Sequence, residues 1–127
     1  MILIPISIGE LIDKISILKI KIRKMKGEKL INVKRELNEL EARLIEKNLK
    51  IDQKLISKLS DINLKLWNIE DKIRSKEISN EFDDEFVQLA RSVYQQNDKR
   101  ASLKREINFL YNSQLVEEKL YYQNIKL

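Results

Sequence analysis

Apolar residues recur at every third or fourth position through most of the chain, the spacing that places side chains on one face of an α-helix. The first such series consists of Ile8, Leu11, Ile12, Ile15, Leu18, Ile22 and Met25. Pro5 disfavours a helix before Ser7, and Ser7 with Glu10 forms a capping-box pattern. We therefore expect an extended segment over residues 1–6 and a helix over about 8–26.

This first helix carries a second apolar strip. Ile17 and Ile20 lie on the side opposite the main series. A helix that is apolar on two faces is usually covered on both. We expect the cover to come from the rest of the bundle or from another subunit.

Two further series alternate by three and four residues, as in the seam of a coiled-coil pair. They are Leu30, Val33, Leu37, Leu40 and Leu44, followed by Leu55, Leu59, Ile62, Leu66, Ile69 and Ile73. They predict helices over about 28–48 and 53–77. The short connection between them predicts that these two helices form an antiparallel hairpin.

The run ISNEFDD over residues 78–84 predicts a loop, and Asp83 or Asp84 is suited to cap a helix over about 84–111. Ser113 is suited to cap a final helix over about 113–123. The chain is thus predicted to be one all-α domain over residues 1–127. We expect a helical bundle built on a long antiparallel helical hairpin.

Composition narrows the chemistry of this domain. Among its 127 residues are no cysteine and no histidine, which excludes disulfides, thiolate nucleophiles and the commonest catalytic base. We expect no cofactor and no metal ion. The apolar stretch MILIPISI lacks a basic leader and is too short to span a membrane, so we expect a cytoplasmic protein.

Polar residues occupy the inward face of the helix predicted over about 84–111. At about 100° per residue, four of them point in the same direction as Phe86. These four are Asn97, Arg100, Lys104 and Asn108. Three turns of the apolar stripe are thus expected to be polar. A buried charge without a partner costs several kcal/mol, so these side chains require partners or water.

The preceding helix and the first helix offer such partners: Glu10, Asp13, Glu70 and Arg74. One interpretation is a network of ion pairs that fixes the register of the helices. The other is a solvated pocket in which Arg100 and Lys104 receive an anionic ligand, because arginine binds carboxylate or phosphate in a bidentate manner.

The runs PISIGELIDKISILKIKI, LWNIEDKIR, FVQLARSVYQQNDKRASLKREIN and SQLVEEK together resemble an uncharacterised family of short bacterial and bacteriophage proteins. The likeness covers nearly the whole chain, and the third run is its most specific part. The resemblance implies one complete small protein. It implies no activity, substrate or catalytic residue.

Two enzyme classes were compared with the sequence. Glu36 with Glu39, and Glu81 with Asp84, superficially fit the paired acidic motifs that bind magnesium in all-α nucleotide pyrophosphohydrolases. The gap between the two pairs is too long for that pattern, and a solvated charge face explains them better. The run LIDKISILKIKI loosely looks like the first helix of chorismate mutases, which bind a dicarboxylate in a helical core. The arginine expected near the start of that helix is missing.

Nucleic-acid binding is a third alternative. The net charge is +5, and basic residues crowd the stretch from Lys19 to Arg35. Lysines in such a cluster can neutralise phosphates. The cluster lacks interleaved aromatic residues for base stacking, so nucleic acid is not the partner we expect.

The sequence favours a self-associating helical interaction or scaffold module without catalytic activity, forming a homodimer or binding a partner helix. The alternative is a metal-independent binding or isomerase-like pocket for a small anionic metabolite. That pocket would be lined by the inward polar residues of the third and fourth helices.

Overall fold

Four helices are present in residues 1–120, the part of the chain that this computed structural model describes. They are α1 (Ile8–Lys24), α2 (Gly27–Glu46), α3 (Gln53–Ile78) and α4 (Asp84–Leu110). The all-α prediction is confirmed, and these bounds agree with the predicted ones to within two residues. The segment 1–6 that precedes α1 is not helical, as predicted.

Three of the helices, α1, α3 and α4, begin where the sequence supplies a capping side chain. The Ser7 hydroxyl accepts a hydrogen bond from the Glu10 amide at 3.1 Å. Asp52 accepts one from the Lys54 amide, and Asp83 accepts one from the Phe86 amide, each at 2.9 Å. These side chains satisfy amide groups that have no partner within the first turn of a helix.

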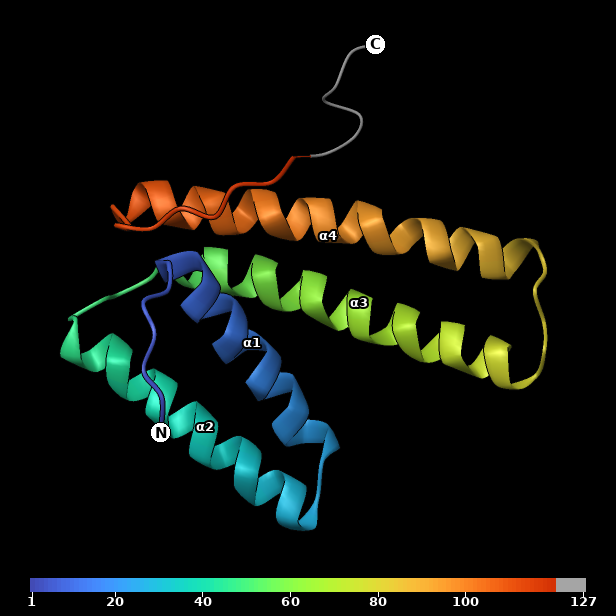
Figure 1. The fold of residues 1–127 in the computed structure, drawn as a ribbon, viewed down its shortest axis with the longest axis horizontal. Coiled ribbons are helices and arrows are strands. Elements are labelled where there is room, and N and C mark those ends of the chain that lie inside the picture. Colours follow the sequence, from blue (N-terminus) through green and yellow to red (C-terminus); the bar gives the residue numbers. More distant parts are fainter. Residues whose placement is uncertain (121–127) are drawn as a thin grey trace.

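The helices pair as α1 with α2 and as α3 with α4, and α1 also packs against both α3 and α4 (Figure 1). A long antiparallel hairpin is present, as predicted, but α3 and α4 form it (Figure 1). The prediction that the second and third helices form it is wrong, because α2 packs on α1 alone. After α2 the chain turns at Asn48, which has a positive φ of 52°. The connection then leads α3 to the far side of α1, so the apolar seams of α2 and α3 face different partners.

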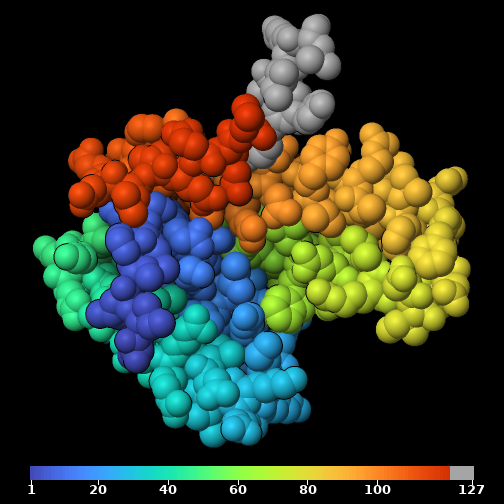
Figure 2. Space-filling model, in the orientation of Figure 1, coloured from blue at the N-terminus to red at the C-terminus, as the bar shows by residue number. Residues whose placement is uncertain are grey.

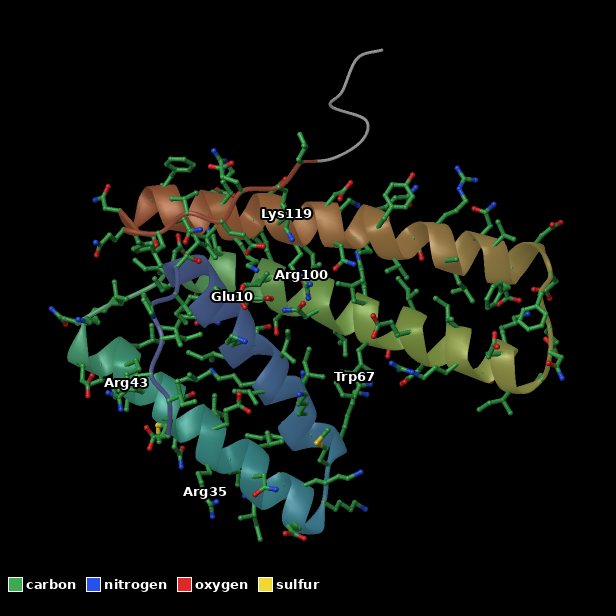
Figure 3. All side chains as sticks on the ribbon, viewed as in Figure 1. Glu10, Arg35, Arg43, Trp67, Arg100 and Lys119 are labelled. Carbon is green, nitrogen blue, oxygen red and sulfur yellow. The ribbon has the colours of Figure 1, made fainter. Side chains whose placement is uncertain are left out.

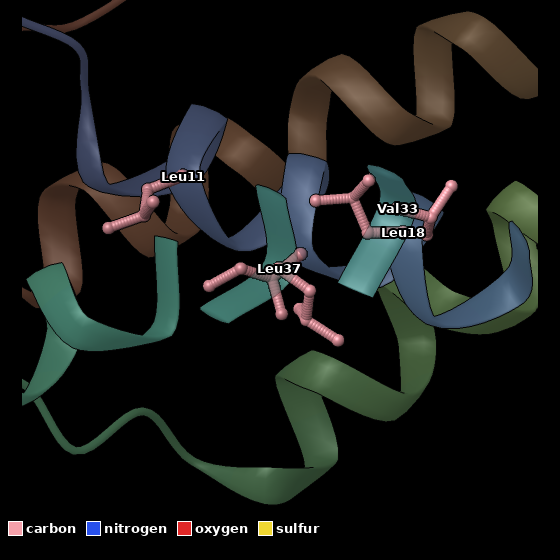
Figure 4. Close-up of a cluster of buried hydrophobic side chains, with 5 residues drawn as sticks. Leu11, Leu18, Val33 and Leu37 are labelled. Atoms are coloured by element: carbon pink, nitrogen blue, oxygen red, sulfur yellow. The ribbon is translucent and has the colours of Figure 1, made fainter. Parts of the chain in front are cut away.

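Two apolar clusters form the core, and α1 contributes to both. In the first, Leu11, Ile15 and Leu18 of α1 pack against Val33 and Leu37 of α2 (Figure 4). In the second, Ile12 of α1 packs against α3 and α4. Its other buried members are Leu55, Leu59, Leu103 and Ile107. In the second predicted strip of α1, Ile20 is 1% exposed and Ile17 is half-buried, so the expectation that α1 is covered on two faces is met within one chain.

The helix predicted over about 113–123 is wrong for residues 113–120, which are irregular. Asn112 has a positive φ of 53° and turns the chain back along α4 (Figure 1). Two carboxylates of this return segment are engaged by α4, since Glu117 pairs with Lys104 and Glu118 pairs with Arg105. Residues 121–123 lie outside the described part of the chain.

The distal halves of α3 and α4 project beyond α1 and α2 as an arm (Figure 2). Its tip is held by Lys76, whose ammonium lies 2.9–3.3 Å from carboxylate oxygens of Glu81, Asp83 and Glu85. These contacts, led by the hydrogen bond to Asp83, raise the pKa of Lys76. The rings of Phe82 and Phe86 meet edge to face at 5.3 Å beside this cluster.

Candidate functional site

The inward polar residues of α4 lead to a cluster between α1, α3, α4 and the return segment, which we call the polar junction. Its members are Glu10, Asp13, Ser16, Asn63, Arg100, Lys104 and Glu117. Figure 3 shows Glu10, Arg100 and Lys119 gathered where α1 meets α4.

Lys104 is the centre of the polar junction. Its Nζ lies 2.5 Å from Glu10 Oε2, 3.2 Å from Glu117 Oε2 and 3.7 Å from Asp13 Oδ2. The side chain is only 11% exposed. One buried ammonium is thus surrounded by three carboxylates from two separate segments, which compensates the cost of removing its charge from water.

The electrostatics of the polar junction keep these groups charged. Burial lowers the pKa of Lys104, but its hydrogen bond to Glu10 and the charges of Asp13 and Glu10 raise it further, so the net shift is upward. Hydrogen bonds from Lys119 and Lys104 lower the pKa of Glu117. Both shifts favour the ion pair at neutral pH.

Asn63 connects the anionic and cationic sides of the polar junction. Its Nδ2 donates to Asp13 Oδ1 at 2.9 Å and to Ser16 Oγ at 3.3 Å. Its Oδ1 accepts from Arg100 Nη1 at 3.3 Å. Asn63, Asp13 and Ser16 are all buried, so each of these polar groups requires the partner that it has.

Asn108 has a different role, because it holds the start of α1. Its Oδ1 accepts a hydrogen bond from the Gly9 amide at 2.6 Å, and Ser113 Oγ accepts one from the Ile8 amide at 2.9 Å. The backbone of Gly9 lies so close to α4 that an added Cβ would be 2.5 Å from the Lys104 carbonyl oxygen. Glycine at this position permits the close approach of the two helices.

The structure brings together four of the eight residues predicted for the site: Glu10, Asp13, Arg100 and Lys104. Asn108 is buried beside them, and Asn97 is half-buried in the wall of an adjoining pocket. Glu70 and Arg74 do not take part. They are exposed and pair with each other at 3.9 Å. Both lie on the part of α3 that follows its junction with α1 at Asn63.

The expectation that the middle of the inward face of α4 is polar is wrong in part. Leu103 and Ile107 are also buried there, at 7% and 0% exposure. They pack in the second apolar cluster, whereas Lys104 and Asn108 contact the start of α1. The buried face of α4 is wider than one stripe at this point, because α4 packs against two helices.

Sequence reasoning missed several residues of the site: Ser16, Asn63, Glu117 and Lys119. Ser16 and Asn63 carried a usable signal, since each interrupts a helix rich in leucine and isoleucine. Glu117 and Lys119 carried none, because they were assigned to a helix that does not form.

A pocket of about 250 Å³ adjoins the polar junction. It is lined by Asn97, Asp98, Arg100, Ala101, Lys104 and Lys119. One wall is α4, and Lys119 from the return segment forms another part of the lining. We call this space the cationic pocket, because three of its six lining residues are basic.

A second, apolar opening of about 470 Å³ lies where α2 and α3 flank α1 without touching each other. Its apolar lining consists of Ile12, Ile15, Leu44, Ile45, Leu49 and Ile56. On its polar edge, Lys19 pairs with Glu41 at 3.8 Å. We call it the apolar groove.

The segment 1–6 is the other unusual apolar surface. Met1, Ile2, Leu3 and Ile4 are between 69% and 90% exposed. Only Ile6 packs against the core, in the cluster between α1 and α2. A contiguous exposed apolar surface of this kind is typical of an interaction site.

The basic residues of α1 and α2 lie mostly on the surface, and several of them contact other side chains. Lys19 pairs with Glu41, and the Lys24 ammonium lies 5.5 Å from the centre of the Trp67 ring. The two acidic pairs that resemble magnesium ligands of pyrophosphohydrolases do not come together. Glu39 instead pairs with Arg43, and Glu81 pairs with Lys76.

Across residues 1–120, no helix combines the length and apolar character needed to cross a lipid bilayer.

Comparison with known proteins adds a family but no activity. Neither the curated proteins nor the solved structures give a significant match. Residues 2–127 match the family described as "Family of unknown function (DUF6165)". Because this match spans nearly the whole sequence, the chain belongs to that family of unknown function.

Proposed function

We propose that this protein is a helical interaction module that self-associates as a homodimer, with the segment 1–6 of each copy seated in the apolar groove of the other. The observation that carries this proposal is that one chain exposes both an apolar segment and an apolar groove. None of residues 1–6 lines the groove of its own chain.

The chemistry of the two surfaces matches. Residues 1–6 include no charged side chain. Pro5 disfavours helical backbone in the residue before it, so α1 does not extend into this segment. The groove has leucine and isoleucine side chains from three helices. Removing both surfaces from water in one contact is favourable because the hydrophobic effect scales with the apolar area that is buried.

Magnitudes favour a reciprocal contact over a single one. Burying four exposed aliphatic side chains contributes roughly 6 kcal/mol, at about 1.5 kcal/mol each. Association costs on the order of 4–15 kcal/mol, so one segment in one groove gives little net affinity. A two-fold symmetric dimer makes the contact twice, at about 12 kcal/mol, for one association cost. We therefore expect a dimer that dissociates on dilution.

Light scattering after size exclusion, from submillimolar to low micromolar concentration, tests the dimer. Ile45→Ser removes an exposed side chain from the groove, and Leu3→Ser removes one from the segment. Both variants are expected to weaken the dimer. Ile31→Ser is the matched control, because Ile31 is also an exposed isoleucine of α2 but does not line the groove.

A strict monomer at all these concentrations would contradict self-association. A dimer that Ile45→Ser and Leu3→Ser leave unchanged would contradict the proposed contact.

The cytoplasmic location remains a prediction from the sequence, supported by a chain of this length without any cysteine.

A further inference from the structure

We infer that the cationic pocket binds the oxyanion group, phosphate or carboxylate, of a small metabolite, with Arg100 as the principal contact. This inference is independent of the dimer, since none of the residues of the cationic pocket lines the apolar groove.

Arg100 has the donors for such a ligand. Its guanidinium makes one hydrogen bond, from Nη1 to the neutral Oδ1 of Asn63 at 3.3 Å. The carboxylates of Glu10, Asp13 and Glu117 pair with Lys104 and not with Arg100. A guanidinium has five N–H donors in a planar fork, so the group retains donors for a bidentate contact with an oxyanion.

The charges of the ion pairs around Arg100 balance one another without the Arg100 guanidinium. They join three ammonium groups to three carboxylates: Lys14, Lys104 and Lys119 with Glu10, Asp13 and Glu117. A network needed only to fix the helices would thus be electrically complete without a further cation. Arg100 is half-buried and adds a positive charge to this set, and Asp98 is the acidic residue of the same pocket wall.

The remaining lining suits a ligand with one anionic end. The ammonium groups of Lys104 and Lys119 also line the wall, where each is paired with carboxylates. The Asn97 amide supplies a neutral donor and acceptor. Asp98 is the acidic member of the wall. An uncharged or hydroxylated part of the ligand is therefore expected on the side of Asp98.

A bound ligand is expected to stabilise the return segment against α4. Lys119 belongs to this segment and Arg100 to α4 (Figure 3). Both line the cationic pocket. An oxyanion held between them would join the segment to the helix. Binding is therefore expected to raise the melting temperature, because a ligand that binds only the folded state stabilises it by mass action.

Inorganic phosphate and succinate are suitable probes, each compared with sodium chloride at the same ionic strength. The thermal midpoint and the NMR shifts of the side-chain amides of Asn63 and Asn97 are measured in parallel. Either probe is expected to raise the midpoint beyond the chloride value and to move these amide signals. A response to phosphate alone identifies a phosphoryl ligand, and a response to succinate alone identifies a carboxylate.

Variants separate the cationic pocket from general charge effects. Arg100→Gln is expected to weaken binding by about tenfold or more, since it removes a charge-assisted contact. Lys119→Gln is expected to weaken it less, and it changes no helix. Arg91→Gln, which removes an exposed arginine from the same helix, is the matched control and is expected to bind like the wild type.

Two results would overturn the site. One is a wild-type protein for which both probes act no differently from chloride. The other is binding by Arg100→Gln, or by Lys119→Gln if the first variant does not fold, that equals binding by Arg91→Gln.

Discussion

The amide of Gly9 donates a hydrogen bond of 2.6 Å to the side-chain Oδ1 of Asn108, which joins the first turn of α1 to the last turns of α4. The two residues are 99 positions apart in the chain. At this point the helices are so close that a Cβ on Gly9 would also lie 3.0 Å from Asn108 Oδ1.

We expect Gly9→Ala to destabilise the protein by about 2 kcal/mol, because forcing a methyl group into a packed contact typically costs 1–3 kcal/mol. Helix propensity alone predicts the opposite sign, a gain of about 1 kcal/mol. The free energy of unfolding, measured in urea by circular dichroism, distinguishes the two outcomes.

Gly27→Ala is the control for this substitution. A Cβ on Gly27 would have no neighbour within 4 Å, and only its positive φ of 64° disfavours alanine. We expect a loss of about 1 kcal/mol from the backbone conformation. If Gly9→Ala were as stable as the wild type, the close approach of α1 and α4 would not exist in solution.

The helices were predictable because each one has apolar residues at helical spacing, and α1, α3 and α4 also begin at a capping side chain. Their pairing was not. A short connection after α2 suggested that α2 packs on α3, yet packing is decided by which apolar faces meet, and Ile12 of α1 packs against α3. Spacing within one helix cannot show which other helix will cover it.

The candidate site was predictable at positions where the direction of a side chain around its helix is enough to determine whether it is buried. Lys104 and Asn108 are buried as their angles indicated. Glu70 and Arg74 lie on the face of α3 that also carries Asn63, but α1 does not reach them, so their direction did not lead to burial. Glu117 depends on the turn at Asn112, which no periodic pattern reveals.

Lys104→Met is expected to lower the free energy of unfolding by about 2 kcal/mol at neutral pH. Breaking a fully buried pair costs about 3–5 kcal/mol, and the loss here is smaller because Glu10 and Glu117 can hydrate. Lys14→Met is the control. Lys14 also pairs with Glu10, at 3.6 Å, but is exposed, so we expect a change below about 0.5 kcal/mol.

The contribution of Lys104 should depend on pH in a defined direction. Its pKa is raised in the folded state above the ordinary value of 10.5. Its contribution is therefore complete below pH 10.5 and is lost as the pH rises through the folded-state pKa. Wild type should lose stability more steeply than Lys104→Met above this pH. Parallel profiles would show that Lys104 is not paired.

Gln96 offers a substitution that should stabilise the protein. Within residues 1–120, its Oε1 is the one buried side-chain N or O atom that lacks a hydrogen-bond partner. Replacing Gln96 by methionine removes the unsatisfied acceptor and keeps a flexible chain of similar length, so we expect a gain of about 1 kcal/mol. Gln95→Met, at an exposed neighbouring position, should leave the urea midpoint unchanged. A loss of stability in Gln96→Met would indicate that its oxygen does have a partner.

The contact between Gly9 and Asn108 also has a consequence for how the chain is made. On the ribosome α1 emerges first, but the oxygen that accepts its Gly9 amide is added 99 residues later. At about 5–20 residues per second, α1 waits on the order of 5–20 s for that partner. During this interval α2 and then α3 are made, but the side of α1 that carries Gly9 lacks its α4 partner and stays open to chaperones or to other nascent chains.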